Sequence, residues 1–216
     1  MGAAQTNSVQ VVTKRIDKEF SYRDGYEVNI DGERAEVRIE TWAKPTIKIQ
    51  IDLIAKNSDK EQAEKDLEKM RYLAQRVKNK IYLRNYLDVP DGAPELQSQL
   101  KAVYVIMVPE DCPVYLKNNY GFADIKNLMS SLRLNTRFSR IGLENIKGNI
   151  DINTTFGDLF ADKLDGNVKV ASRRSDITFK QMRGSYDINA QYGILNFFAT
   201  DGLLDFNLEA DKSTVF

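Results

Sequence analysis

The sequence predicts a mostly β protein: a parallel β-helix, or β-solenoid, with 18-residue coils, preceded by a small β-rich region that contains one α-helix. Three observations predict this fold. Apolar residues and glycine recur every 18 residues from Pro113 onward. Several earlier segments alternate apolar and polar side chains, and one segment between them has apolar residues at helical spacing.

The repeat divides residues 109–216 into five coils and part of a sixth. We number them coil 1 (113–130), coil 2 (131–148), coil 3 (149–166), coil 4 (167–184) and coil 5 (185–202), followed by the partial coil 203–208. The second position of each coil is apolar, being Val114, Leu132, Ile150, Val168, Tyr186 and Leu204. Positions four, eleven, thirteen and sixteen form similar columns, and glycine ends coils 2–5. One coil cannot bury its apolar face, so coils stacked ~4.8 Å apart must supply the core.

The outward positions agree with this register. The third position places Arg133, Asp151, Lys169 and Asp187 in consecutive coils, so stacking brings opposite charges side by side. The fifth position holds a column of asparagines at Asn135, Asn153, Asn189 and Asn207. We expect both columns to lie on a solvated face.

Residues 9–108 are expected to form a β-rich region that caps the solenoid. Residues 34–41 and 46–53 alternate strictly, as strands with one buried face do. A helix is predicted over 59–79, because a capping box at Ser58 and Glu61 precedes an apolar stripe of Ala63, Leu67, Met70, Ala74 and Val77. Strands at 81–87 and 103–108 follow, separated by a loop at 88–99.

Composition excludes several functions. Basic and acidic residues number 31 each, so no net charge favours nucleic acid as a partner. The chain has no histidine, which removes the commonest general base and metal ligand. Cys112 is the only cysteine and is expected to be a buried apolar residue. We therefore predict no enzyme, no metal site and no cofactor.

The first residues bear on location. No apolar run approaches the ~20 residues of a transmembrane segment. Residues 1–8 are interpreted as a flexible tail or as the remnant of a signal peptide. The second interpretation indicates an exported protein, in the periplasm or at the cell surface, and the first leaves a cytoplasmic location open.

The eighth position of each coil supplies the candidate binding residues. Aromatic side chains and one arginine stack there just before a small residue, and we name this column the corner stripe: Tyr120, Phe138, Phe156, Arg174 and Tyr192. If it points outward, it suits a binding surface for sugars or a protein partner. The alternative is that these side chains turn inward or are covered, and serve packing.

The tenth position places Arg140, Asp158 and Asp176 in consecutive coils. Two carboxylates one coil apart are the only candidates for acid–base or calcium chemistry in this chain. With Arg173 and Arg174 nearby, a network of surface ion pairs is the alternative that we favour.

Four features together cover roughly residues 10–210: the alternating stretch Glu36–Trp42, the single helix, the strand that ends at Val108-Pro109 and the repeated turns. In these features the chain resembles the "putative adhesin" family of bacterial β-helical proteins. The resemblance implies an exported β-helix with a cell-surface role and no established catalytic residues. Ser139 and Ser175 depart from the family's turn glycine, and the aromatics of the corner stripe are bulkier than its usual small residues.

Three functions remain open at this point. The first is a non-catalytic surface module that binds a glycan or a protein. The second is a structural or polymerising scaffold that self-associates through the solenoid ends, whose strand edges lack partners. The third, a carbohydrate-active enzyme, depends on Asp158 and Asp176 alone.

Overall fold

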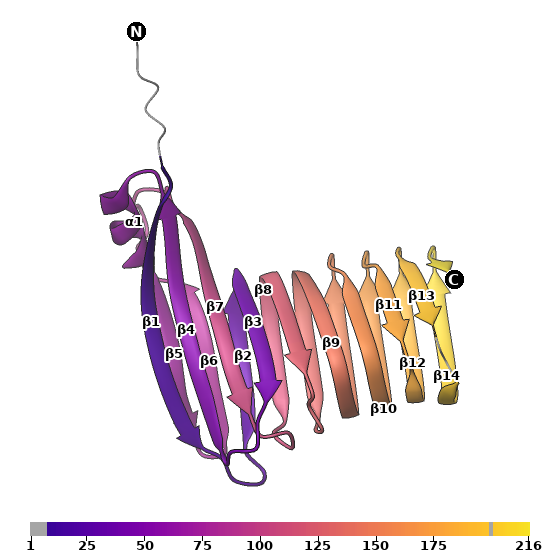
Figure 1. Ribbon diagram of the computed structural model, residues 1–216. Coiled ribbons are helices and arrows are strands. Elements are labelled where there is room, and N and C mark those ends of the chain that lie inside the picture. The colour runs from indigo at the N-terminus through magenta and orange to yellow at the C-terminus, as the bar shows by residue number, and fades with distance from the viewer. Residues whose placement is uncertain (1–7, 199–200) are drawn as a thin grey trace.

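The structure, a computed structural model, describes residues 8–198 and 201–216. Residues 1–7 of the expected tail and Thr200 of the sixteenth column lie outside this range. Every strand of the described chain belongs to one continuous sheet that coils along the molecule (Figure 1). The elements are β1 (Gln10–Ser21), β2 (Glu27–Glu33), β3 (Ala35–Thr41), β4 (Thr46–Asn57), α1 (Lys60–Leu67), β5 (Met70–Val77), β6 (Lys80–Leu87), β7 (Gln99–Val108), β8 (Val114–Lys126), β9 (Leu132–Thr155), β10 (Leu159–Arg173), β11 (Ile177–Lys180), β12 (Arg183–Gln191), β13 (Ile194–Phe198), β14 (Gly202–Asp211) and β15 (Thr214–Val215).

The predicted parallel β-solenoid is confirmed, and coils 1–5 stack in the predicted register. Val114 pairs with Leu132, Ile150 with Val168, and Val168 with Tyr186, each partner lying 18 residues further along the chain. The apolar residues of the second, fourth and eleventh positions are almost completely buried in these coils. The core is therefore a set of apolar columns that run along the solenoid axis.

Three bends per coil give the solenoid three sides. The residues at the bends have positive φ, which is uncommon for residues other than glycine. At the eighth position the whole corner stripe has φ between 52° and 58°. The other two bends lie at the fifteenth position, with Asn127, Asn145, Lys163 and Gln181, and at the eighteenth, with Gly148, Gly166 and Gly184.

The ninth position alternates glycine and serine along the stack: Gly121, Ser139, Gly157, Ser175 and Gly193. A Cβ on Gly157 would overlap the backbone carbonyl oxygen of Ser139, so only glycine fits there. The buried Ser175 hydroxyl accepts a hydrogen bond from the Gly157 N–H at 3.2 Å and donates one to the Arg173 carbonyl. Serine therefore does not weaken this column, because it supplies the acceptor that each preceding glycine amide needs.

We predict that Gly157→Ala lowers the free energy of unfolding by about 3 kcal/mol. The added Cβ would overlap the Ser139 carbonyl oxygen, and the backbone hydrogen bonds between neighbouring coils prevent the two strands from moving apart to relieve the overlap. Gly142→Ala is the matched control: its Cβ would meet only the Asp124 carboxylate, at 3.1 Å, and that side chain can move. The control should change stability by less than about 0.5 kcal/mol. Urea unfolding of both variants checks this, and equal stability would contradict the close-approach argument.

The stack extends into the N-terminal region, which the repeat did not indicate. Strands β2 and β3 pair in parallel with β8, so that Val28 lies against Val114 and Val37 against Ala123. Strands β6 and β7 pair in parallel with β2 and β3 in turn. Residues 27–41 and 80–108 thus form two further rungs, and they share the solenoid's core.

Antiparallel strands end the stack on this side. Strand β4 pairs antiparallel with β7, β1 with β4, and β5 with β6. Helix α1 packs against β1 and β4 at the same end (Figure 1). This change of strand direction supports the proposal that residues 9–108 cap the solenoid. Antiparallel strands can be joined by short turns, so they cover the end of the stack without starting another parallel coil.

The predicted helix over 59–79 is wrong in its length. Helix α1 spans only Lys60–Leu67, and Met70–Val77 is strand β5, joined to β6 by a two-residue turn at Lys78 and Asn79. The capping box is also absent, because Asp59 is the N-cap and accepts a hydrogen bond from the Glu61 N–H. Backbone pairing with β6 outweighs helix propensity here, and Val77 of the expected stripe is 46% exposed. The described chain contains no helix that could cross a membrane.

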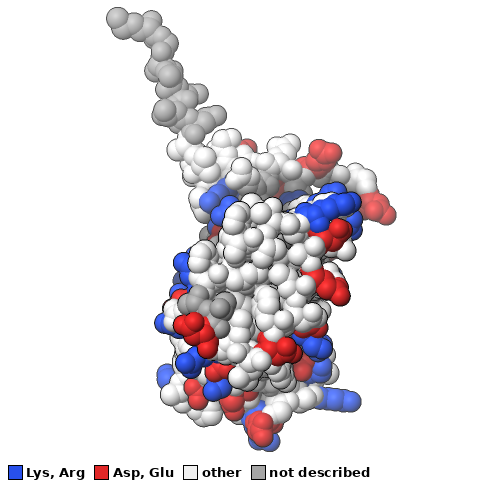
Figure 2. Space-filling view, turned by 90° about the vertical axis from the view of Figure 1, so that its right-hand side faces the viewer, with Lys and Arg blue, Asp and Glu red and all other residues white. Residues whose placement is uncertain are grey.

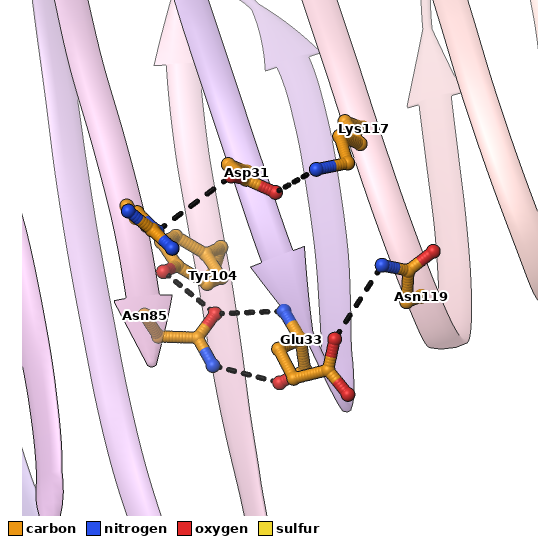
Figure 3. Close-up of polar contacts among 7 residues, drawn as sticks. Asp31, Glu33, Asn85, Tyr104, Lys117 and Asn119 are labelled. Atoms are coloured by element: carbon orange, nitrogen blue, oxygen red, sulfur yellow. Dashed lines mark hydrogen bonds and ion pairs between the residues drawn. The ribbon is translucent and has the colours of Figure 1, made fainter. Parts of the chain in front are cut away.

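A buried polar network joins the N-terminal rungs to each other (Figure 3). The Tyr104 hydroxyl donates to Asn85 Oδ1 at 3.0 Å, and Asn85 Nδ2 donates to the Glu33 carbonyl at 2.7 Å. Burial raises the pKa of Tyr104, so its phenol stays protonated and remains a donor. At the surface Asp31 pairs with Lys117 of coil 1. These contacts fix the order of rungs that are far apart in the sequence.

The partial sixth coil is out of the predicted register. Tyr186 pairs with Phe206 and Ile188 with Leu208, instead of with Leu204 and Phe206. The register shifts between Gly184 and Ser185 of the facing strand, so one residue bulges, and Leu204 is 85% exposed. The coil also continues further than expected, through β15.

Cys112 is buried, as predicted, and burial raises the pKa of its thiol to about 12. A thiol in this environment is a structural residue.

Asp66 of α1 ties the helix to the loop before β7. Its Oδ2 accepts hydrogen bonds from the N–H groups of Gln97 and Ser98, at 3.0 and 2.8 Å, and its Oδ1 accepts one from Gln62. Burial alone would raise the pKa of this carboxyl, but the hydrogen bonds outweigh burial and hold the pKa below its ordinary value.

We expect Asp66→Ala to lower the free energy of unfolding by about 2 kcal/mol at pH 7, because the N–H groups of Gln97 and Ser98 lose a charged acceptor. Since the folded pKa is lowered, the stabilisation is complete above the unfolded value of about 3.9 and disappears as pH falls through the folded value. Denaturant unfolding of wild type and variant should therefore converge towards pH 2. A difference that stays constant with pH would contradict the ionic role.

Candidate functional site

The corner stripe lies on the outer surface of the solenoid. Its residues occupy the bend between two sides of the coil, where positive φ directs the side chain away from the core while the ninth position turns inward. Tyr120, Phe138 and Tyr192 are 55%, 38% and 39% exposed, Phe156 is half-buried and Arg174 is exposed. The backbone of each bend stays in the ladder, as in the bond from the Phe156 N–H to the Arg173 carbonyl.

The rings of the stripe stack on one another along the axis. The centroids of Tyr120 and Phe138 are 4.9 Å apart and those of Phe138 and Phe156 are 4.8 Å apart, with interplanar angles of 6°. The Arg174 guanidinium lies 5.3 Å from the Phe156 centroid and 5.8 Å from that of Tyr192. Because each ring covers its neighbour's face, the stripe presents ring edges to solvent.

Two cations extend the stripe beyond the residues that the repeat indicated. Arg34 has the same positive φ and donates its N–H to the Asn119 carbonyl of coil 1, as the other bends do to their next coil. Lys212 closes the other end, with its Nζ 5.3 Å from the Tyr192 centroid. Arg34 was missed because it lies in a rung separated from the repeats by about 70 intervening residues.

A hollow of about 630 Å³ lies beside the stripe. It combines residues from both predicted groups: Phe138, Phe156 and Arg174 of the stripe with Arg140 and Asp158 of the charged column. Gly121, Ser139 and Gly157 complete its lining. Tyr120, Tyr192 and Asp176 do not line it. Asp176 instead accepts a hydrogen bond from the Ile194 N–H at 2.9 Å.

The arginines at and near this hollow form no close ion pair within the described part of the chain. We expected ion pairs between them and Asp158 or Asp176, but within the described ranges no carboxylate oxygen lies within 4.0 Å of Arg137, Arg140, Arg173 or Arg174. The prediction of an ion-pair network is therefore wrong. Asp176 instead bonds the backbone of coil 5, and adjacency along the column alone does not bring the charged groups within 4.0 Å of each other.

Arg137 is a member of this group that sequence reasoning missed. It stands at the seventh position of coil 2, and its guanidinium lies 5.3 Å from the Phe138 centroid. Coil 4 has Arg173 at the same position. The recurrence of arginine two coils apart, directly before the stripe, was the signal that could have identified it.

The arrangement suits an anionic group. Ring edges carry partial positive charge, and the guanidinium fork matches a carboxylate in geometry. Asp158 is the one carboxylate in the hollow, whereas cleavage of a glycosidic bond ordinarily uses two. Among residues 8–198 and 201–216, no group of three or more His, Cys, Asp or Glu side chains is placed to hold a metal ion.

The chain is similar to several solved protein structures, all at low sequence identity. No family model matches the chain, and no curated protein matches it. A putative adhesin from Bacteroides fragilis is 11% identical, with 94% of this chain and 95% of that chain covered and a TM-score of 0.45. A putative cell adhesion protein from Clostridium sporogenes is 11% identical (94% and 98% covered, TM-score 0.39), and a putative adhesin from Parabacteroides merdae is 10% identical (94% and 95%, TM-score 0.33).

Proposed function

We propose that this chain is a non-catalytic binding module that holds an acidic protein partner at the corner stripe. The observation that carries the proposal is that three arginines at the stripe, Arg137, Arg140 and Arg174, have no carboxylate oxygen within 4.0 Å and lie beside partly exposed rings. Arg137 and Arg174 contact rings of the stripe, but none of these arginines has a carboxylate partner, so their charge remains available to attract and orient an acidic surface. An exported or cell-surface location is part of the same proposal.

The geometry favours a protein over a sugar at this corner. A sugar ring stacks on an aromatic face, and the faces of Phe138 and Phe156 are covered by their neighbours. Aromatic and arginine side chains that remain partly exposed are the residues that dominate binding energy in protein interfaces. The rings of the stripe are also evenly spaced along the axis, which suits a regular strand or helix of the partner laid beside them.

We expect the double variant Arg140→Gln, Arg174→Gln to weaken binding to poly-L-glutamate, used as an acidic polypeptide probe, by at least tenfold, which is about 1.4 kcal/mol. Because Arg174 also lies between the rings of Phe156 and Tyr192, the melting temperature should fall by only about 2–4 °C, which leaves the fold intact. Wild-type binding should weaken as salt is raised from 50 to 300 mM. Biolayer interferometry measures the two binding effects, and thermal unfolding followed by circular dichroism measures the melting temperature.

The matched control is Lys18→Gln with Lys48→Gln, which removes the same charge from two exposed strand residues far from the corner. If the control weakens binding as much as the arginine variant does, poly-L-glutamate is attracted by the total charge of the protein. That result would exclude the corner stripe as the binding site.

The C-terminal end of the solenoid has features that favour a second candidate function, which is self-assembly as a scaffold. Within the described chain, the outer edge of β14 has no partner strand. Leu204, Phe216 and Phe206 are 85%, 71% and 38% exposed there, and Figure 2 shows a broad uncharged surface at this end. Unpaired edges and exposed apolar side chains are the features through which solenoid ends can stack on a second copy.

If the protein is a scaffold, its sedimentation coefficient should rise with concentration, and Leu204→Asp should abolish the rise by placing a charge on the apolar end. Phe160→Asp is the control, because Phe160 is also exposed, at 46%, but lies on the side of coil 3. A wild-type protein that stays monomeric at high concentration in analytical ultracentrifugation would rule this candidate out.

A further inference from the structure

A second and larger hollow runs along a different side of the solenoid. Its volume is about 1040 Å³, and it shares no lining residue with the hollow at the corner. Its lining comes from the N-terminal rungs and from every coil, from Lys80 of β6 to Asn207 of β14. We name it the axial groove. At ~4.8 Å per rung, its eight rungs span about 34 Å.

The exposed side chains of the axial groove are mostly polar, and their charges nearly balance. Asn167 Nδ2 donates to Asn149 Oδ1 at 3.2 Å, and Asn207 Nδ2 donates to Asp187 Oδ1 at 3.1 Å. The lining contains three basic and four acidic side chains, which are Lys80, Arg133, Lys169, Glu27, Asp151, Asp187 and Asp205. Ion pairs join Lys80 to Glu27 at 2.8 Å and Arg133 to Asp151 at 3.7 Å. The groove thus offers many donors and acceptors with almost no net charge.

These properties exclude most polymers as occupants. A nucleic acid or another polyanion needs an excess of basic side chains, which the groove lacks. A peptide that adds as a strand needs a free edge, but the strands of coils 1–4 beneath the groove are paired on both sides. A lipid needs a continuous apolar surface, but among the apolar lining residues only Pro113 and Tyr115, at one end of the groove, are more than 3% exposed.

A neutral polysaccharide has the complementary chemistry. Its hydroxyl groups both donate and accept, so each can bond a carboxamide, a carboxylate or an ammonium group of the lining. Its repeating unit is similar in length to the spacing between rungs, so a chain laid along the axis meets the same side-chain column again and again. Many weak hydrogen bonds of this kind add up along the groove, although each contributes little alone.

We propose that the axial groove binds a linear, neutral polysaccharide along the solenoid axis. This goes beyond the protein partner assigned to the corner stripe, because it uses another side of the coil and opposite chemistry. A module with both sites would join a glycan to an acidic protein.

The test is binding of the full chain to an array of immobilised neutral glucan, mannan and galactan oligosaccharides, with hyaluronate and poly-L-glutamate as acidic probes. At least one neutral series should bind, with affinity rising with chain length up to the length of the groove. Asn149→Ala with Asn167→Ala should weaken that binding at least tenfold. Both residues are at the surface, and an unchanged melting temperature would show that the fold is intact.

The matched control is Asn135→Ala with Asn153→Ala, which removes two exposed asparagines of neighbouring coils that do not line the groove. It should bind as wild type does, and so should the Arg140→Gln, Arg174→Gln variant. Equal loss in the two asparagine variants would overturn the proposal. Loss of glycan binding in the arginine variant would also overturn it, because the glycan would then bind at the corner stripe. Binding of the acidic probes alone would overturn it as well. Because the corner variant is scored separately on poly-L-glutamate, failure of one proposal leaves the other measurable.

Discussion

The whole molecule depends on a ladder of backbone hydrogen bonds that runs along its axis, from each coil to the same position of the next. A coil of 18 residues has no interior of its own, so its apolar side chains are buried only when another coil covers them. The requirement for register follows, because a slip of one residue would turn every apolar column outwards. The bends at positive φ and the glycine at position 157 are local conditions that this ladder imposes on the chain.

In-register stacking also creates the two candidate sites. When a residue type recurs at one position of the coil, its copies form a row along the surface. The whole row then has the chemical character of that one position. The bend at the eighth position gives a row of ring edges with arginines beside it, and the side that contains the third position gives a neutral polar groove. One register therefore produces two surfaces of contrasting chemistry on different sides of the same molecule.

The repeat was sufficient to predict coils 1–5 and the buried columns, because uninterrupted spacing survives in the sequence as periodicity. It could not predict the rungs built from 27–41 and 80–108, where strands adjacent in space are separated by intervening elements. The helix over 59–79 was overestimated, because apolar spacing in Met70–Val77 fits a helix and a half-buried strand about equally well, and pairing with β6 decides between them. The bulge at Leu204 follows from a shift in strand pairing that no residue in the sequence indicates.

The sequence by itself determined the solenoid, its period, the inward columns and the identity of the residues in the corner stripe, because these follow from local spacing repeated many times. Only the tertiary structure decided that the rings stack face to face, that Arg137 and Arg140 stay without carboxylate partners, and that Phe156 and Asp158 line one hollow. The physical reason is that side-chain direction at a bend depends on the backbone angles there and on the neighbouring coils, and neither is encoded in the spacing of residue types.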